Sequence, residues 1–151
     1  MSDPQSVDVL IAGAGPAGLH LARLLAQAGA SVQVVDPLLD LRHSAFSSAA
    51  LPMEAVQEFE LPARVQAAQW RSWQLFGPDD QRRQWQADHV LGAVLDFGSL
   101  RQWLAERARQ AGAVVQLGWR AQCLESLPPG STGVQTQLRG PGGQRVQCAH
   151  Q

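Results

Sequence analysis

Two features near the start of the chain carry chemistry: the glycine-rich run Gly13–Gly18 and the acidic residue Asp36, which follows the next apolar run. The three glycines of this run meet three different demands. Gly13 permits a tight turn between a strand and a helix, Gly15 leaves room for a phosphate against bare backbone, and Gly18 lets the helix lie close to the strand. A helix that begins here offers unpaired N–H groups and the positive end of its dipole to an anion. This arrangement is typical of a site that holds a dinucleotide by its pyrophosphate.

The contacts of such a site follow from the motif. Pro16 suits the first turn of the helix, because no N–H group is needed at that position. We expect the following residues to bind the cofactor: Gly13, Ala14, Gly15, Pro16, Ala17, Gly18 and Asp36. The alternative interpretation is a glycine-rich turn that binds nothing.

The acidic residue Asp36 indicates which dinucleotide would bind. Its carboxylate can accept hydrogen bonds from the ribose hydroxyls. A 2′-phosphate would place a second anion beside it, at a Coulomb cost of at least about 1 kcal/mol even in water. We therefore expect FAD or NAD and not NADP. In the alternative interpretation Asp36 only caps the turn before Pro37.

The residues around this motif predict a β-α-β unit. The apolar run Val7–Ala12 is typical of a strand buried on both faces. A helix is expected from Leu19 to Ala28, ended by Gly29, and a second strand over Ser31–Val35 leads to Asp36. The helix positions expected to face the sheet are Leu21, Leu24, Leu25 and Ala28, with Arg23 and Gln27 facing water.

Residues 37–96 are expected to form an insertion made of a loop, a helix and a hairpin. A long connection over 37–51 precedes a short helix from Pro52. The buried positions of this helix would be Met53, Val56, Phe59 and Leu61. The turn sequence Gly77–Asp80 predicts a hairpin between 70–76 and 82–86, and another strand is expected over Val90–Leu95.

The last third of the chain predicts a helix, a strand and a meander. Asp96 is a candidate N-cap for a helix that runs to about Ala111, before Gly112. The apolar face of this helix would hold Leu100, Trp103, Leu104 and Ala108. Ala113–Leu117 would add a third parallel strand beside the first two. Over residues 119–151, three alternating runs at 120–124, 134–139 and 145–149 predict an antiparallel β-meander.

Composition places the chain among ordinary globular proteins. Its 151 residues are 45% hydrophobic and 17% charged with a net charge of −1, so neither nucleic acid nor an anionic membrane is an expected partner. No apolar run is long enough for a transmembrane segment and no signal peptide precedes the first strand, so a cytoplasmic location is expected. The absence of Lys and Tyr excludes lysine Schiff-base and tyrosine acid–base chemistry within this chain.

The remaining reactive side chains predict neither a metal site nor a catalytic base. The four histidines lack ligand spacing, and Cys123 and Cys148 are expected to be buried or half-buried free thiols. His43 and Ser47–Ser48 lie on the loop after Asp36, where a role near the cofactor and plain solvent exposure both stay open. The catalytic residues are therefore unknown.

The tryptophans fit two interpretations. Trp70, Trp73 and Trp85 could line an apolar pocket for an isoprenoid or aromatic substrate, or they could cover a sheet face. Trp103 is expected to pack its helix against the sheet, because it falls on the apolar face of that helix.

The segment Val7–Pro37, with its G-A-G-P-A-G-L turn and V-V-D-P end, resembles the N-terminal FAD-binding segment of flavoproteins of the aromatic-hydroxylase and geranylgeranyl-reductase type. It is also similar to the same segment of lycopene cyclases. The resemblance continues through the loop with Arg42, then Ser47–Leu61, Leu100–Glu106 and Gly112–Val115. It implies one FAD-binding domain over residues 1–151, of the α/β class. Its Rossmann-like parallel sheet would carry the G-x-G-x-x-G turn and an added antiparallel meander.

The resemblance also implies roles for single residues. Gly13, Gly15, Ala17 and Gly18 would face the FAD pyrophosphate, Asp36 the adenosine ribose, and Arg42 the phosphate or the ribose edge. Phe97 stands where aromatic hydroxylases often carry an Arg, and Leu39–His43 replaces an Asn-rich stretch of the lycopene cyclases.

In these flavoproteins the meander leads into an Asp-Gly-containing strand, whereas this chain ends at His150–Gln151. We therefore expect the chain to be the N-terminal portion of a longer protein. The last strand of the meander would then leave an exposed edge, through which copies could self-associate.

The function implied by the resemblance is that of a FAD-dependent, monooxygenase-like oxidoreductase. FAD would carry out redox chemistry on an apolar or aromatic small molecule, with NAD as a candidate electron donor. One alternative is a non-redox, FAD-dependent cyclase or isomerase similar to lycopene cyclase. Another is a stand-alone dinucleotide-binding module or inactive fragment.

Overall fold

The computed structural model describes residues 5–43, 47, 49–126 and 133–149, excluding the side chains of residues 5 and 123–126. The chain divides into two compact units. The first unit is formed by Met1–Ser44 together with Arg101–Gln151, and the second by Ala45–Leu100. The glycine-rich turn and Asp36 both belong to the first unit.

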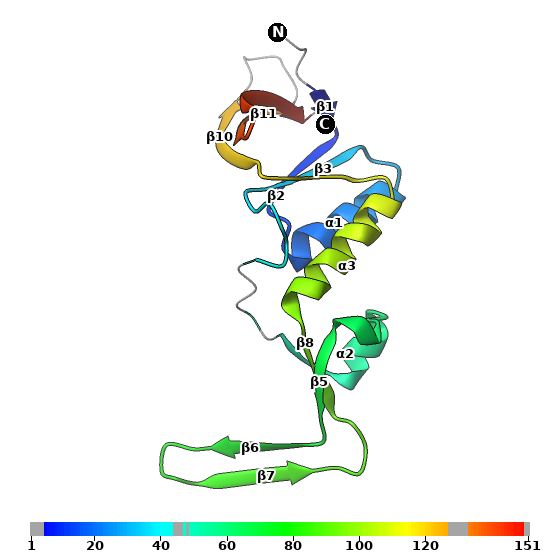
Figure 1. Ribbon diagram of the computed structural model, residues 1–151, viewed down its shortest axis with the longest axis vertical. Helices are drawn as coiled ribbons and strands as arrows, with labels where there is room; N and C mark the ends of the chain where they lie inside the picture. The colour runs from blue at the N-terminus through cyan, green and yellow to red at the C-terminus, as the bar shows by residue number, and fades with distance from the viewer. Residues whose placement is uncertain (1–4, 44–46, 48, 127–132, 150–151) are drawn as a thin grey trace. The chain divides into compact units, whose positions relative to one another are not determined.

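A three-stranded parallel sheet forms the centre of the first unit. Its strand order is β2 (Val9–Ala12), β3 (Val32–Asp36) and β9 (Val114–Leu117). Helices α1 (Pro16–Gln27) and α3 (Phe97–Gln110) lie side by side against one face of this sheet (Figure 1). The parallel strands all end at the same edge, beside the start of α1. The predicted Rossmann-like parallel sheet is confirmed.

Helix α1 turns a different face to the sheet than its leucine spacing predicts. Leu19 and Ala22 are fully buried, whereas Leu21 and Leu24 are each 46% exposed. The phase of the helix is set by Gly18, which packs against the preceding turn. Leu19, the next residue, and Ala22, one turn later, must therefore face the sheet as well. The prediction that Leu21, Leu24 and Ala28 face the sheet is therefore wrong. Of the other predicted positions, Leu25 and Arg23 are half-buried, and Gln27, like Ala28, is exposed.

The ends of the helices follow the predicted capping residues. Gly29, at φ +92°, closes α1 through hydrogen bonds from its own amide and that of Ala30, a Schellman motif. Asp96 caps α3, because its Oδ1 accepts the Ser99 amide at 2.6 Å. The buried face of α3 holds Leu100, Trp103, Leu104 and Ala108, as predicted.

Three strands form the predicted antiparallel meander: β10 (Arg120–Ser126), β11 (Val134–Gly140) and β12 (Gly143–Ala149). The meander lies on the face of the parallel sheet opposite the helices (Figure 1). The predicted turn around Pro128–Ser131 lies outside the described residues. The strand pattern of the meander is otherwise confirmed.

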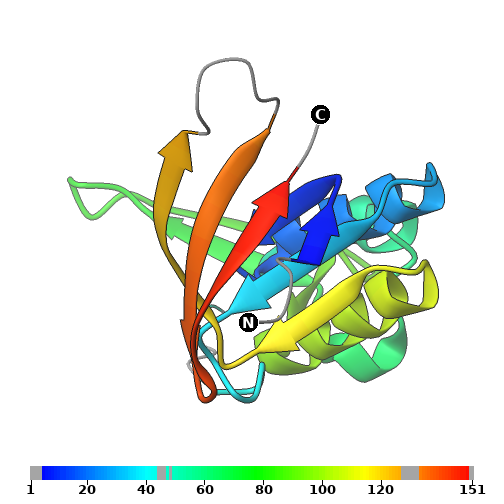
Figure 2. The ribbon, with the colours of Figure 1, turned by 90° about the horizontal axis from the view of Figure 1, so that it is seen from above.

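The start of the chain differs from the prediction of one strand over residues 7–12. It forms β1 (Gln5–Val7) and then β2, and β1 pairs in parallel with β12 (Figure 2). The strand breaks at Asp8, whose Oδ2 accepts the Ser31 amide and hydroxyl, each at 2.7 Å. The last strand of the meander is therefore paired on both sides, and the prediction of an exposed edge there is wrong. Among the described strands, β10 ends this sheet on the side away from β1.

The second unit contains a three-stranded antiparallel sheet. Its order is β4 (Ala50–Pro52), β8 (Gly92–Leu95) and β5 (Gln66–Trp70). Strand β5 was not predicted, because alanine and glutamine are not enriched in strands. Trp70 lies against Gly92 of β8, where a Cβ atom would collide with its ring. Trp70 therefore covers a sheet face, the second of its two interpretations.

Helix α2 (Met53–Glu58) and a short 3-10 helix (Ala63–Val65) connect β4 to β5. Val56 is buried as predicted, and Met53 and Leu61 are half-buried. Phe59 is 50% exposed, so the prediction that it is buried is wrong. The helix ends at Glu58, and Phe59 is its C-cap residue, off the regular helical phase.

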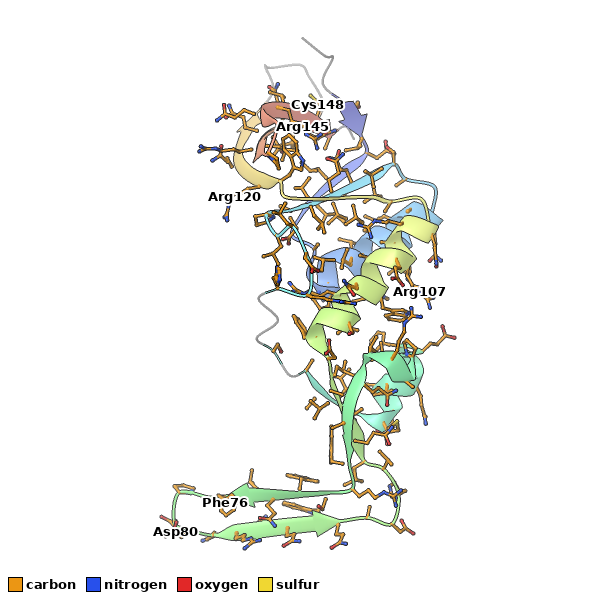
Figure 3. The ribbon with its side chains drawn as sticks, viewed as in Figure 1. Phe76, Asp80, Arg107, Arg120, Arg145 and Cys148 are labelled. Carbon is orange, nitrogen blue, oxygen red and sulfur yellow. The ribbon has the colours of Figure 1, made fainter. Side chains whose placement is uncertain are left out.

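The predicted hairpin is also present, formed by β6 (Ser72–Phe76) and β7 (Arg82–Gln86). Every residue of both strands is exposed. Trp73 and Trp85 lie opposite each other and stack, with ring centroids 4.1 Å apart. Figure 3 shows Phe76 near the tip of the hairpin and Asp80 at the tip. The two exposed tryptophans thus pack mainly on each other.

Candidate functional site

The glycine-rich turn joins β2 to α1 at the edge where the parallel strands end. Gly13 has φ +111°, a conformation that other residues rarely adopt, and its amide donates to the Val35 carbonyl at 2.8 Å. A Cβ atom on Gly18 would collide with the Gly13 carbonyl and would crowd Ile11. The fold itself thus requires glycine at both positions, at Gly13 for backbone conformation and at Gly18 for packing.

Gly15 differs from Gly13 and Gly18 in both backbone conformation and packing. Its φ of −77° and ψ of 172° are an extended conformation that any residue adopts. A Cβ atom built on Gly15 would meet nothing within 4 Å. Neither backbone conformation nor packing against the described residues requires glycine there. The open space beside Gly15 is the space that a phosphate needs in order to approach the backbone.

The start of α1 offers hydrogen-bond donors to the same space. Gly15 is the N-cap, Pro16 opens the helix, and within the described residues no side chain caps this end. Leu19 makes the first i−4 bond of the helix, to the Gly15 carbonyl at 3.0 Å. The amides of Ala17 and Gly18 precede it and have no carbonyl partner inside the helix. These two donors and the positive end of the dipole fit a pyrophosphate.

Asp36 lies at the end of β3 with its carboxylate directed at the glycine-rich turn. Its Oδ2 accepts the Ala14 amide at 2.8 Å, and its Oδ1 accepts the Leu38 amide at 2.9 Å. The residue is only 9% exposed. A carboxylate offers about four acceptor positions, so about two remain for hydroxyl donors. Asp36 therefore holds its own turn and keeps the capacity to accept hydrogen bonds from a ribose.

Ala14 contributes in a different way from the other residues of the turn. Its side chain is fully buried, and its amide is engaged by Asp36. Ala14 thus fixes the position of the carboxylate.

The main chain of Asp36 is held from its other side by the residues that follow β9. The Trp119 amide donates to the Asp36 carbonyl at 2.9 Å, and the Gly118 amide donates to the Leu38 carbonyl at 2.8 Å. Sequence reasoning did not find Gly118 or Trp119. A backbone hydrogen bond between distant segments leaves no signature in residue type, so no sequence signal could have shown it.

Arg42 is the predicted site residue that the described contacts do not connect to the glycine-rich turn. Its Nε donates to Gln102 Oε1 of α3 at 2.9 Å. Both residues line a groove of about 470 Å³ between α3 and the loop after β3, with Leu39, Leu117, Glu106 and Arg109. Gln102 had not been singled out from the sequence. Gln102 contacts Arg42 only because the loop after Asp36 folds against α3, and no local sequence pattern shows this long-range contact.

The other candidate residues form no catalytic arrangement in the described part of the chain. His43 is exposed, and it is the backbone carbonyl of His43 that accepts the Arg101 Nη2 at 2.6 Å. The Ser47 hydroxyl accepts the Ala49 amide at 3.4 Å, and Ser48 lies outside the described residues.

The described residues hold neither a metal cluster nor a membrane-spanning helix. Among them, no group of three or more His, Cys, Asp or Glu side chains could hold a metal ion. Cys148 is half-buried and free, as predicted, whereas the Cys123 side chain is not described. No helix in this part of the chain has the length and apolar character needed to cross a membrane.

Sequence comparison connects this geometry to known proteins. The family described as FAD binding domain matches residues 6–150. Digeranylgeranylglycerophospholipid reductase of Haloferax volcanii is 34% identical over 109 residues, which are 70% of this chain and 26% of that protein. This chain thus spans about a quarter of the length of that relative.

Solved structures share the fold. A geranylgeranyl bacteriochlorophyll reductase-like protein from Thermoplasma acidophilum has a TM-score of 0.82 and 21% identity, over 98% of this chain and 38% of its own. Aklavinone-11 hydroxylase, solved with FAD and aklavinone, has a TM-score of 0.69 and 21% identity, over 99% of this chain and 32% of its own. Because the family match runs over nearly the whole chain and includes the glycine-rich turn and Asp36, the chain belongs to the FAD binding domain family, with FAD as its cofactor.

Proposed function

We propose that this chain is the FAD-binding part of a FAD-dependent, monooxygenase-like oxidoreductase that acts on an apolar or aromatic small molecule. The observation that carries the proposal is Gly15, a glycine that neither conformation nor packing requires, beside donors that suit a diphosphate. The names of the relatives, a lipid reductase and an aklavinone hydroxylase, support a redox reaction.

In this proposal the first turn of α1 binds the pyrophosphate. The amides of Ala17 and Gly18 donate to phosphate oxygens across the open space beside Gly15. Gly13 and Pro16 shape the turn so that these amides point outward. A diphosphate carries enough negative charge to gain from the helix dipole as well as from the hydrogen bonds.

Asp36 and Arg42 would bind the remainder of the adenosine diphosphate. The free acceptor positions of Asp36 take the ribose hydroxyls, while Ala14 keeps the carboxylate in place. Arg42 would use the part of its guanidinium that Gln102 does not engage, and would contact the phosphate or the ribose edge. When bound, FAD supplies electron transfer through its isoalloxazine ring, and these residues supply binding and orientation.

The location, electron donor and partners of the protein belong to the same proposal. We infer a cytoplasmic protein that has NAD as a candidate electron donor, takes a small-molecule substrate and does not bind nucleic acid. The net charge of −1 supports the last point, because nucleic-acid binding needs a basic surface. Self-association through an edge of this sheet would use β10 or β1, because β12 is paired on both sides.

FAD titration of the purified chain tests the proposal. We expect saturable binding by calorimetry and a flavin absorbance spectrum that stays with the protein after gel filtration. The Gly15→Val variant serves as the matched control, because it puts a side chain into the open space beside Gly15 that the phosphate would occupy. A wild-type chain that binds neither FAD nor ADP would refute the proposal.

A second measurement separates redox chemistry from a non-redox use of FAD. In the full-length gene product, NADH or NADPH should bleach the absorbance of the bound flavin. Flavin that stays oxidised with both donors, while the protein isomerises or cyclises its substrate, would favour the cyclase alternative.

A further inference from the structure

The ring of Trp119 is enclosed by the turn between β11 and β12. A Cβ atom on Gly140 would collide with the indole ring, and one on Gly142 would lie 3.9 Å from it. Glycine at position 140 therefore lets the meander strand pass directly over the ring. This contact fixes the side chain of the residue whose amide holds the Asp36 carbonyl.

Gly118 lies close both to this turn and to the loop that follows Asp36. A Cβ atom on Gly118 would lie 2.8 Å from Leu39 Cδ2 and 3.4 Å from Pro141 Cγ. Gly118 is thus in close contact with the loop on one side and with the meander turn on the other. The hydrogen bond from the Gly118 amide to the Leu38 carbonyl joins the same two segments, Gly118 and the loop after Asp36.

Arg145 completes the enclosure of Trp119 from β12, on the meander side of the unit (Figure 3). Its guanidinium carbon lies 4.1 Å from the centroid of the Trp119 ring. Its Nη2 donates to Gln116 Oε1, which also accepts Gln33 Nε2 at 2.9 Å. The guanidinium of Arg145 therefore lies between the Trp119 ring and the side-chain amide of Gln116, a residue of the parallel sheet.

The environment of Arg145 strengthens this contact with the ring. Burial lowers the pKa of Arg145, but arginine keeps its proton in proteins, so a cation faces the ring. Cation–π attraction increases when the cation is partly removed from water. Within the described residues the buried Nε of Arg145 has no hydrogen-bond partner. The ring and Gln116 must therefore offset the desolvation of this guanidinium.

We propose that Arg145 and Trp119 are positioning residues for the Asp36 carboxylate. The guanidinium holds the indole ring, the Trp119 amide holds the Asp36 carbonyl at 2.9 Å, and the carboxylate of Asp36 holds the Ala14 amide at 2.8 Å. Through these contacts β12, a strand of the meander, sets the geometry of the glycine-rich turn at the edge of the parallel sheet. The functional consequence rests on the proposed role of Asp36 in binding the cofactor ribose.

Amide hydrogen exchange of the whole ligand-free chain, measured by NMR, tests the positioning directly. In Arg145→Gln we expect the Ala14 and Trp119 amides to exchange about tenfold faster, because the bonds that protect them open more often. The Ala30 amide, bonded to Leu25 in α1, should keep its rate. Arg145→Lys, which retains a cation beside the ring, should restore most of the protection.

A matched control is available on the neighbouring strand. Arg139 of β11 is exposed, so Arg139→Gln removes the same charge from the same sheet and should leave the Ala14 rate unchanged. An unchanged Ala14 rate in Arg145→Gln would overturn the proposal, and so would equal acceleration at Ala30. Should Arg145→Gln fail to fold, Trp119→Phe weakens the same contact with a smaller ring and should accelerate Ala14 exchange about threefold.

Calorimetry with FAD tests the functional consequence by a double-mutant cycle. Arg145→Gln should weaken FAD binding about three- to tenfold, and should add no further loss in an Asp36→Asn background. Additive losses would show that Arg145 does not act through Asp36. A wild-type chain that binds no FAD would remove the proposed function, whereas the exchange result would still decide whether Arg145 positions Asp36.

Discussion

The Oδ2 atom of Asp36 lies 2.8 Å from the backbone nitrogen of Ala14, in the middle of the glycine-rich turn. The acid that would bind the ribose is therefore already fixed to the turn that would bind the phosphates. A carboxylate held in this way loses little further freedom on binding, so more of its interaction energy is available as affinity.

Replacement of this carboxylate should weaken cofactor binding. We expect Asp36→Ala to lose about 1.5–3 kcal/mol of FAD binding free energy, roughly ten- to hundredfold in Kd, as charge-assisted hydrogen bonds disappear. Calorimetry measures the loss. Asp8→Ala is the matched control, since Asp8 also holds a backbone amide of this unit, that of Ser31, but lies between β1 and β2. Equal FAD affinity in wild type and Asp36→Ala would contradict the assignment.

Substitution of Gly15 should impair FAD binding, whereas substitution of Gly18 should lower the stability of the fold. Gly15→Val should stay folded, with a loss of at most about 1 kcal/mol of unfolding free energy from the poorer N-cap, and yet fail to retain FAD, because a Cβ atom at position 15 meets nothing within 4 Å in the protein. Gly18→Ala should lose about 1–3 kcal/mol of unfolding free energy, because its Cβ atom collides with the Gly13 carbonyl. Urea titration and flavin absorbance give the two readouts. The assigned geometry fails if Gly15→Val still copurifies with FAD.

The cap of α3 should contribute to stability alone. Asp96→Ala removes the acceptor of the Ser99 amide, and we expect the free energy of unfolding to fall by about 0.5–2 kcal/mol. Urea denaturation followed by circular dichroism measures this difference. Asp79→Ala, in the exposed turn of the hairpin, should leave the midpoint unchanged. An unchanged midpoint in Asp96→Ala would argue against the cap.

The stacked tryptophans of the hairpin should have a spectroscopic signature. Two indole rings with centroids 4.1 Å apart couple their transitions, so the chain should show an exciton couplet in far-ultraviolet circular dichroism. Trp73→Ala should abolish the couplet, and Phe76→Ala on the same strand should preserve it. A couplet that survives in Trp73→Ala would exclude this pairing.

Much of the first unit could be predicted because local residue types decide it. A glycine-rich turn between an apolar run and a helix leaves few alternatives to a β-α-β unit, and Gly29, Asp96 and Gly112 mark helix ends by known capping chemistry. The meander strands alternate polar and apolar residues, so their number and direction also followed. These features depend on neighbours within about one turn or one strand.

The features that sequence reasoning missed depend on distant contacts. Leucine spacing gave the wrong buried face for α1, because the close approach at Gly18 fixes the helix rotation more strongly than apolar content does. The first strand divides at Asp8 because its carboxylate binds Ser31, which no local pattern shows. The same holds for the pairing of Arg42 with Gln102 and of Trp119 with Asp36.

The parallel pairing of β1 with β12 joins residues 5–7 to residues 147–149. Closing so long a loop costs entropy that local turns avoid, and contacts of this range slow folding. During synthesis the first strand must wait until residues 147–149 have left the ribosome before it can pair with β12. The β-α-β unit, which needs only the first 36 residues, can form well before that. The strand–turn–helix that carries the glycine-rich turn can thus form early in folding, whereas the contacts of the meander that hold Asp36 in place form later.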